Sequence, residues 1–348
     1  MHLCENVFTC IVSAKGVVLN NKSILKWLPL ILAFLIGLLV GCVVENKIAN
    51  KDKPVQSYEV RQGGYSLINP LLECDVPKDK NLEPFKHKVE ALIHEKAGSN
   101  KSNHLSVYFR DLNNGQWFGI NESEEFSPAS LLKVSTMMAY FKLAEASPEI
   151  MGKKIKFNGT YNYNAMENIK PSVTINPGQT YTIEELIYRM VAHSDNNANS
   201  LVLDYIDPML LQKTFKDLGI NLPDIRKPED FMSVKTYASF FRILFNASYL
   251  SKDMSSKALE YLTRADFKAG LVSGVPSNIV VAHKFGERAL GPQAEIKELH
   301  DCGIVYYPAH PYLLCVMSKG NDFKYLANSI KDLSRLVFEE VNHQHADS

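Results

Sequence analysis

The stretch SPASLLKVSTMMAYF, residues 127–141, decides the fold and indicates a chemistry. Ser-Pro-Ala is expected to start a helix, because the apolar residues that follow recur at helical spacing: Leu131, Val134, Met138 and Phe141. Ser130 and Lys133 then share one face of the helix, so the lysine amine can lie beside the serine hydroxyl. A serine hydroxyl needs such a base to act as a nucleophile at neutral pH. Near the helix start, free backbone N–H groups also favour a developing oxyanion.

This Ser-x-x-Lys spacing is a weak signal by itself, because it also occurs at Ser23–Lys26 inside an apolar leader. Two further motifs give it weight. Ser194-Asp195-Asn196 follows a helix that begins with the capping box Thr182-Ile183-Glu184-Glu185. His283-Lys284-Phe285-Gly286 lies on a predicted late strand. The motifs therefore stand at a helix start, in a loop between helices and on a strand.

Hydrophobic periodicity outside the motifs predicts the order of the elements. A first helix with Phe85 and Ile93 on its apolar face precedes a hairpin whose strands are Leu105–Arg110 and Gln116–Ile120. Helices are then expected at 182–192, 207–219, 234–247, 252–264 and 323–341, and strands at 280–286, 302–307 and 312–317. This order predicts an α/β (α+β) sandwich, in which N- and C-terminal helices flank an antiparallel sheet and an all-helical subdomain is inserted.

Ser-x-x-Lys, Ser-Asp-Asn and Lys-Thr-Gly, in that order, form the signature of class A β-lactamases and penicillin-binding proteins. The chain resembles this superfamily over residues 82–343. In this resemblance residues 82–148 and 265–343 make up the α/β part and residues 149–264 the helical part. It implies a serine hydrolase that acts on β-lactams or on D-Ala-D-Ala peptides of the cell wall, without a cofactor.

The resemblance implies roles for the residues that match its motifs. Ser130 would attack a carbonyl carbon and become acylated, and Lys133 would take or relay its proton. Burial and a second cation, Lys284, are both expected to lower the pKa of Lys133. Ser194 would pass the proton to the leaving nitrogen.

The same resemblance assigns the substrate contacts. Asn196 would hold the substrate's amide side chain, and the backbone N–H groups of Ser130 and Glu287 would form the oxyanion hole. Gly286 would let the substrate lie against the strand edge without a side chain in the way. Asp195 is expected to be a helix cap.

Two departures from the family pattern bear on activity. Phe285 replaces the Thr or Ser whose hydroxyl helps to bind a substrate carboxylate, although Lys284 is expected to keep its charge and Arg288 to compensate. The Glu-x-x-Leu-Asn pattern that supplies the deacylating base is absent from residues 219–233, GINLPDIRKPEDFMS. Glu229 and Asp230 are expected to be solvated, with Glu229 a candidate base.

Because the usual deacylating base is missing, deacylation is expected to be slow. The alternative function is that of a non-catalytic envelope protein that binds or senses a ligand. Another amidohydrolase, such as a glutaminase, is disfavoured by export.

The N-terminus indicates export. WLPLILAFLIGLLVGCVV, residues 27–44, carries no charge and follows several lysines. It ends in Leu39-Val40-Gly41-Cys42, which resembles a bacterial lipobox, so residues 1–44 are an export signal with a lipidated Cys42 or an uncleaved membrane anchor. Residues 45–81 read as a tether whose apolar island, 65–72, docks on the folded part. The enzyme is thus expected outside the cytoplasm, anchored to the bacterial membrane.

Composition excludes several other classes. The 348 residues hold 38 Lys and Arg against 38 Asp and Glu, so the net charge of zero gives no case for nucleic acid as a partner. There is no HExxH motif and the ten histidines are scattered, so no metal site is expected. Cys302 and Cys315 flank a predicted hairpin turn. They are expected either to form a disulfide or, as the sequence slightly favours, to be two separate buried core residues.

Overall fold

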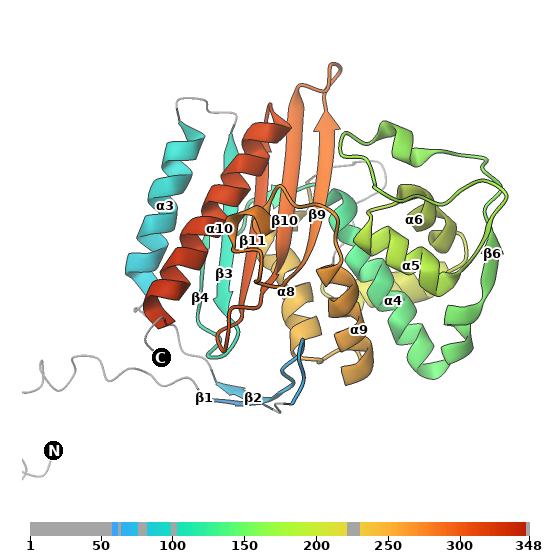
Figure 1. Cartoon of the computed structure of the whole chain (residues 1–348), viewed down its shortest axis with the longest axis horizontal. Helices are drawn as coiled ribbons and strands as arrows, with labels where there is room; N and C mark the ends of the chain where they lie inside the picture. The colour runs from blue at the N-terminus through green and yellow to red at the C-terminus, as the bar shows by residue number, and fades with distance from the viewer. Residues whose placement is uncertain (1–57, 62–63, 76–81, 99–102, 221–229, 346–348) are drawn as a thin grey trace, which may run out of the picture. The chain divides into compact units, whose positions relative to one another are not determined.

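The fold is built on an antiparallel sheet of five strands in the order β4-β3-β11-β10-β9 (Figure 1). The computed structural model describes residues 58–61, 64–75, 82–98, 103–220 and 230–345. The strands of the sheet are β3 (His104–Asp111), β4 (Trp117–Ile120), β9 (Val281–Leu290), β10 (Ile296–Val305) and β11 (Tyr312–Gly320). Because β3 and β4 precede the helical middle and β9 to β11 follow it, both ends of the domain build the sheet.

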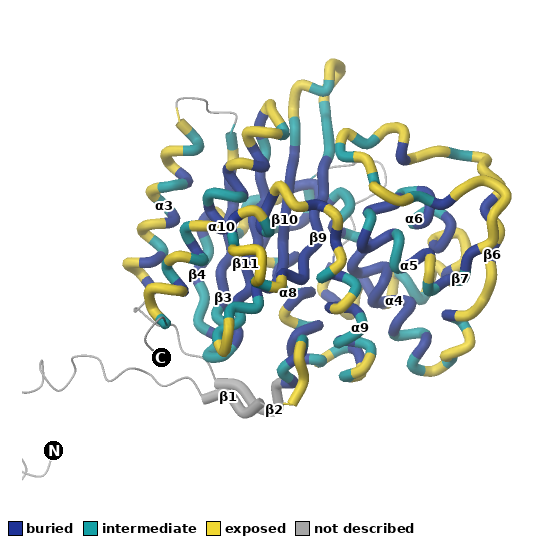
Figure 2. Tube along the Cα trace, in the orientation of Figure 1, coloured by how far each residue is buried: buried dark blue, intermediate teal, exposed yellow. Residues whose placement is uncertain are grey.

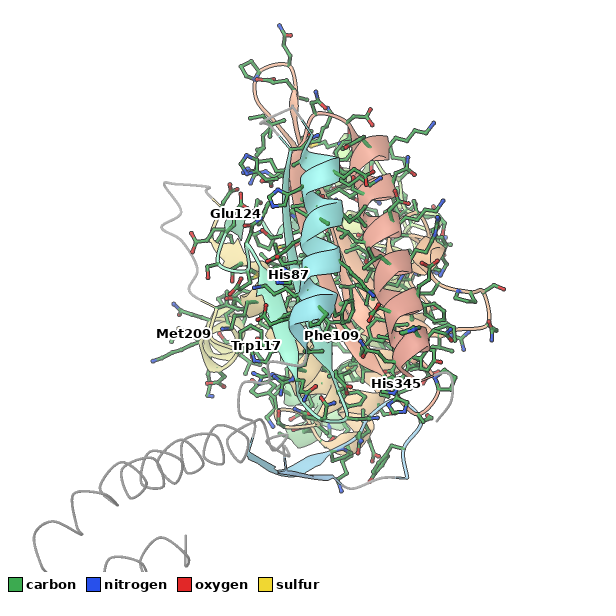
Figure 3. The ribbon with its side chains drawn as sticks, turned by 90° about the vertical axis from the view of Figure 1, so that its left-hand side faces the viewer. His87, Phe109, Trp117, Glu124, Met209 and His345 are labelled. Atoms are coloured by element: carbon green, nitrogen blue, oxygen red, sulfur yellow. A yellow bond between two sulfur atoms is a disulfide. The ribbon has the colours of Figure 1, made fainter. Side chains whose placement is uncertain are left out.

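Helices cover both faces of this sheet. Helices α3 (Glu83–Ala97) and α10 (Phe323–His345) pack on one face, and α8 (Val234–Phe245) packs on the other. Figure 3 shows α3 and α10 side by side, and Figure 2 shows that most of the strand residues between the layers are buried. Phe85 of α3 meets Phe109 of β3 edge to face, with ring centroids 4.9 Å apart. This arrangement confirms the predicted fold class.

The helical part follows the strand β5 (Glu125–Phe126), which pairs with β8 (Met232–Ser233). Its helices are α4 (Lys133–Ala146), α5 (Ile183–Ala192), α6 (Asn196–Leu203), α7 (Pro208–Asp217) and α9 (Lys252–Thr263). Two short strands, β6 (Lys154–Lys156) and β7 (Thr180–Thr182), pair beside them. The predicted capping box of α5 is confirmed, because Thr182 and Glu185 bond to each other's backbone N–H groups. Most residues of α4 are buried, so this helix is the centre of the helical part.

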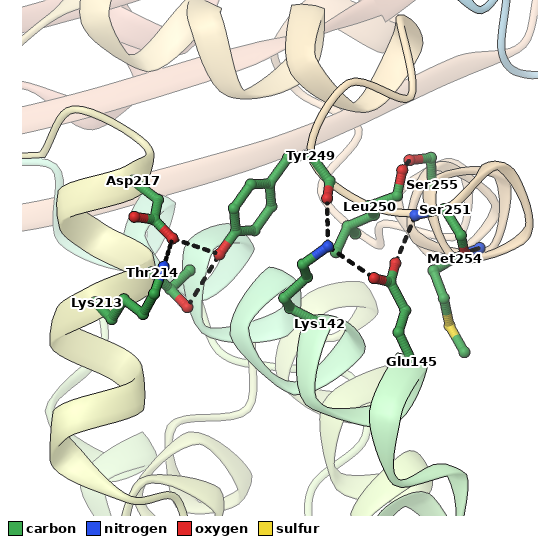
Figure 4. Close-up of polar contacts among 10 residues, drawn as sticks. All are labelled: Lys142, Glu145, Lys213, Thr214, Asp217, Tyr249, Leu250, Ser251, Met254 and Ser255. Carbon is green, nitrogen blue, oxygen red and sulfur yellow. Dashed lines mark hydrogen bonds and ion pairs between the residues drawn. The ribbon is translucent and has the colours of Figure 1, made fainter.

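Polar contacts fix the outer end of α4 (Figure 4). Lys142 donates to the carbonyl oxygen of Tyr249 at 2.9 Å, and Glu145 accepts from the backbone N–H of Ser251 at 2.5 Å. The Tyr249 hydroxyl in turn lies 3.4 Å from a carboxylate oxygen of Asp217 at the end of α7. These contacts tie α4 to α7 and to the connection between α8 and α9.

The apolar island before the first helix docks on the folded part, as predicted. Ile68 is buried in the apolar cluster of the helical part. The Tyr306 hydroxyl donates to the Leu67 carbonyl oxygen at 2.8 Å, and Asn69 N–H donates to the Phe245 carbonyl oxygen at 2.9 Å. β1 (Tyr58–Arg61), before the island, and β2 (Leu71–Asp75), which begins with the last two island residues, form an antiparallel pair that the tether composition did not predict.

Cys302 and Cys315 form a disulfide, so the favoured prediction of two unlinked core residues is wrong. The reason is register: Cys302 of β10 lies directly opposite Cys315 of β11, and the side chains therefore leave the same face of the hairpin. Both residues are fully buried, as the sequence suggested.

Some predictions fall on residues outside the described ranges. These are the export segment of residues 1–44, its Cys42, most of the 45–81 tether, and Glu229. Among the helices that the structure describes, none has the length and apolarity needed to cross a bilayer.

Candidate active site

The turn that carries Ser130 is a short 3-10 helix, η2 (Ala129–Leu132), which runs directly into α4. Ser130 is therefore near the start of the helical segment, as predicted, but one turn before the α-helix itself. Ala129 has a positive φ of 46°. This backbone conformation is unfavourable for any residue that carries a Cβ. The tertiary contacts of this turn hold it in place.

Gly286 of β9 packs against that turn. A Cβ on Gly286 would come within 2.9 Å of the Pro128 carbonyl oxygen and 3.2 Å of the Leu131 nitrogen. The glycine is thus needed for the close approach of β9 to the Ser130 turn. Its predicted role, room for substrate at the strand edge, stays a prediction.

Lys133 is the first residue of α4, and its amine is buried. Nζ donates to the carbonyl oxygen of Ser194 at 2.7 Å, to the Ser194 hydroxyl at 3.2 Å and to Asn196 Oδ1 at 2.5 Å. Burial lowers the pKa of Lys133 to about 8, against the opposing pull of nearby carboxylates. The hydrogen bonds of this amine in the described part of the chain go to Ser194 and Asn196, and none reaches the Ser130 hydroxyl.

Lys284 brings a second amine to Ser194. Its Nζ donates to Ser194 Oγ at 2.9 Å and to the Phe285 carbonyl oxygen at 2.8 Å, and the side chain is fully buried. Burial and the charge of Lys133 push the pKa of Lys284 well below its usual range. The environment therefore disfavours the full charge that the sequence predicted for Lys284.

The departure at Phe285 has a structural cause. Its ring stacks on Phe267 with centroids 4.4 Å apart, in the apolar cluster beneath α10. Lys284 Nζ also lies 4.3 Å from the centre of the Phe285 ring. Phe285 is thus a core residue that also contacts the amine of its neighbour.

The buried carboxylate of Asp195 fixes the conformation of the loop that carries Ser194. Asp195 caps α6, as predicted, by accepting from the backbone N–H groups of Asn197 and Ala198 at 2.9 and 3.2 Å. Asp195 also accepts from Asn164 Nδ2 at 2.7 Å. Ser194 has a positive φ of 58°, and this network holds it there.

A pocket of about 540 Å³ opens at these elements. Its polar wall contains Ser130, Lys133, Asn196 and Glu287, which the sequence singled out. Ser194 and Lys284 lie behind this wall and contact the Lys133 amine or each other. The pocket lining also contains apolar side chains, among them Leu203, Leu211, Phe215 and Phe231.

Three charged side chains at the pocket, Glu167, Glu287 and Arg288, make contacts that the sequence did not predict. Glu167 lines it and accepts a hydrogen bond from Asn196 Nδ2. The Glu287 carboxylate accepts from the backbone N–H groups of Asn168 and Ile169 at 2.5 and 2.8 Å. Arg288 donates to the Ser127 hydroxyl at 2.7 Å. Glu167 follows a 3-10 turn, η4 (Tyr163–Met166), in a segment without periodicity, so no pattern marked it.

Asp230 directly precedes Phe231, which lines the pocket. Asp230 is 2.5 Å from Lys319 in an ion pair, so its carboxylate is already engaged. Within the residues that the structure describes, no group of His, Cys, Asp and Glu side chains is arranged to hold a metal ion.

Solved structures of other proteins share this fold. An acyl-enzyme complex of a PBP-A mutant with penicillin G has a TM-score of 0.63 at 20% identity, covering 77% of this chain and 100% of the other. A β-lactamase from Sphaerobacter thermophilus has a TM-score of 0.63 at 19% identity, covering 73% of this chain and 97% of its own. The fold is therefore the one shared by serine β-lactamases and penicillin-binding proteins.

Sequence comparison gives the family. The beta-lactamase enzyme family matches residues 84–341. A β-lactamase of Bacillus licheniformis is 23% identical over 255 residues, which cover 68% of this chain and 79% of that protein. The chain belongs to the beta-lactamase enzyme family, and is thus a β-lactamase-like serine hydrolase.

Proposed function

We propose that the chain is a membrane-tethered serine hydrolase that forms an acyl-enzyme at Ser130 with β-lactams or D-Ala-D-Ala peptides. The observation that carries this proposal is a buried amine, Lys133, in the wall of the pocket that also holds Ser130. Because burial lowers the pKa of this amine to about 8, part of it is neutral near pH 7 and able to accept a proton.

Acylation then follows from the contacts around Lys133. Ser130 Oγ forms a bond to the substrate carbonyl carbon while its proton passes to Lys133 Nζ. The bond between that carbon and its nitrogen breaks, and the nitrogen takes a proton from the Ser194 hydroxyl. Lys133 Nζ lies 3.2 Å from this hydroxyl and returns the proton to it. No net proton is gained or lost, and the products are the acyl-enzyme and the amine.

Substrate binding is assigned to the rest of the polar wall. The backbone N–H groups of Ser130 and Glu287 would stabilise the oxyanion. Asn196 would bind the substrate's amide side chain through the second N–H of its Nδ2, because the first is donated to Glu167. The penicillin G complex of the PBP-A mutant supports the choice of a penicillin as the first probe.

Release of the acyl group is expected to be slow, because the loop after α7 lacks the Glu-x-x-Leu-Asn pattern. Incubation with penicillin followed by intact-protein mass spectrometry tests the proposal. Wild type should gain the mass of one penicillin and lose it slowly, and Ser130→Ala should gain none. If neither protein is labelled, the alternative of a non-catalytic envelope protein is favoured. This alternative is supported by the contact between the Lys284 amine and the face of the Phe285 ring.

The tether is a separate part of the proposal and rests on the sequence of residues 27–44. We expect the protein in the membrane fraction on the outer side of the bacterial membrane. If Cys42 is the lipidated residue, Cys42→Ala leaves the precursor unlipidated, and metabolic labelling with a radioactive fatty acid is lost. Labelling that survives Cys42→Ala contradicts the lipobox. An unlabelled wild type that still resides in the membrane supports the uncleaved anchor.

A further inference from the structure

Glu167 is a pocket carboxylate that no motif predicted, and it is joined to the catalytic amine through one side chain. Asn196 donates from Nδ2 to the Glu167 carboxylate, while Asn196 Oδ1 accepts from Lys133 Nζ at 2.5 Å. Carboxylate, amide and amine thus form a continuous hydrogen-bonded chain along the wall that also contains Ser130. Such a chain fixes the position of the carboxylate relative to the amine.

The backbone before Glu167 is fixed to the Ser194 loop. Asn164 accepts from the backbone N–H of Asn196 at 2.7 Å and donates to Asp195 at 2.7 Å. Asn164 is itself buried. The short turn that leads into Glu167 therefore cannot shift without breaking contacts of the loop that carries Ser194.

The backbone after Glu167 is fixed to β9. Asn168 N–H and Ile169 N–H donate to the Glu287 carboxylate at 2.5 and 2.8 Å, and Asn168 Nδ2 donates to the same group at 2.8 Å. Glu287 is buried and is the residue whose N–H is assigned to the oxyanion hole. Glu167 is thus held on both sides by elements that also shape the pocket.

The surroundings of Glu167 suit a proton acceptor that works near neutral pH. Partial burial and the negative charge of Glu287 raise the pKa of Glu167, while Lys133 opposes them. A carboxylate with a raised pKa is a stronger base than a solvated one. Among the described residues, the other carboxylate that lines the pocket is Glu287, and it is occupied by three N–H donors.

We infer that Glu167 is the general base that releases the acyl group from Ser130, with Glu287 as the residue that positions it. This inference rests on the proposed function. The Glu167 carboxylate accepts a proton from a solvent water, whose oxygen forms a bond to the ester carbonyl carbon. The bond between that carbon and Ser130 Oγ then breaks, the oxygen takes the proton back from Glu167, and the product leaves as a carboxylic acid.

The experiment separates formation of the acyl-enzyme from its decay. Penicillin is mixed with full-length wild type, Glu167→Gln, Glu287→Gln and the exposed control Glu149→Gln, and adduct mass is followed in time. Glu167→Gln should form the adduct at a rate within about threefold of wild type and lose it about 100-fold more slowly, the lower end of a general-base contribution. Glu149→Gln removes the same charge far from the site and should change neither rate.

Glu287→Gln gives a readout that a purely structural role would not move. Removing its negative charge lowers the pKa of Glu167, so the pH at which the decay rate is half-maximal should shift downward. In the Glu167→Gln variant this pH dependence should be lost.

Several results overturn the inference. One is decay of the Glu167→Gln adduct at the wild-type rate, and another is a slowing of decay by Glu229→Gln in place of Glu167→Gln. A wild-type adduct that never decays also contradicts a base at Glu167, but leaves acylation at Ser130 intact. If wild type forms no adduct at all, the proposed function fails and the inference fails with it.

Discussion

Lys133 donates hydrogen bonds to both oxygens of Ser194, at 2.7 Å to the carbonyl and 3.2 Å to the hydroxyl. This contact joins the first and second sequence motifs, which are 61 residues apart in the chain. It places the proposed base and the proposed proton donor to the leaving group side by side.

The rate of acylation should therefore rise with pH through about 8. Burial lowers the pKa of Lys133 from 10.5 to about 8, and only the neutral amine accepts the Ser130 proton, so protonation below that pH removes the base. Lys133→Ala should lower the acylation rate by about 100-fold or more. The measurement is the second-order rate of penicillin labelling from pH 6 to 9. A flat profile for wild type argues against Lys133 as the base.

Acid should destabilise the fold through His300, which is fully buried next to the Ser130 turn. Its Nε2 lies 2.9 Å from the Ser127 carbonyl oxygen, and its Nδ1 accepts from Ser318 N–H at 3.1 Å, so the neutral ring satisfies both groups. Burial lowers the pKa of His300 from 6.5 to about 4. Between these values the unfolded chain binds more protons than the folded one, so stability falls as the pH drops through this window.

The expected loss of unfolding free energy from His300 is on the order of 3 kcal/mol across that window. Urea unfolding at several pH values measures it. His300→Gln keeps a donor and an acceptor but does not titrate, so its stability should vary less between pH 6.5 and 4. Equal pH dependence in the two proteins would show that His300 is not the group responsible.

The disulfide should be detectable by mass and should matter for stability. Cys302 and Cys315 lie in one tryptic peptide, Glu298–Lys319, which should be lighter by two hydrogens before reduction and should bind alkylating agent only afterwards. Closing a loop of this size contributes about 3 kcal/mol in the chain-entropy model. The double variant Cys302→Ala, Cys315→Ala should melt at a lower temperature. Alkylation of both thiols in the unreduced, denatured protein would contradict the bond.

Phe285→Thr restores the side chain usual in the family but should weaken the fold. The Phe285 ring stacks on Phe267 at 4.4 Å in the core, so its loss leaves a cavity and buries a hydroxyl there. The expected cost is about 3 kcal/mol of unfolding free energy. Phe285→Leu, which keeps an apolar side chain, is the matched control and should cost less. Equal stability of wild type and Phe285→Thr would show that the stacking contributes little.

The arrangement of the fold was predictable where apolar residues recur with a clear period. The helices and strands that were predicted mostly begin and end within a few residues of their predicted bounds, but α6 (Asn196–Leu203) and the short strands β5 to β8 were not predicted. Strand β10 is the exception, because it starts at Ile296, six residues before the predicted Cys302. The missed segment carries Glu298, His300 and Asp301, which are buried polar residues, and a search for apolar alternation passes over them.

The residues of the site were likewise predictable only in part from the sequence. Ordered motifs led to Ser130, Lys133, Ser194 and Lys284, and in the structure both amines donate to Ser194 while Ser130 lines the adjoining pocket. Glu167 was missed because its position depends on contacts between distant segments, such as Asn168 with Glu287, which are 119 residues apart. No local pattern records a contact of that kind.

Ser130 is expected to be the residue that becomes acylated. Penicillin-labelled wild type should be digested with trypsin and its peptides sequenced by tandem mass spectrometry. The added mass is predicted on Ser130, within the peptide Asp111–Lys133, and should be absent after Ser130→Ala. A label on Ser194 or on a lysine, or a label that persists in Ser130→Ala, would contradict the account.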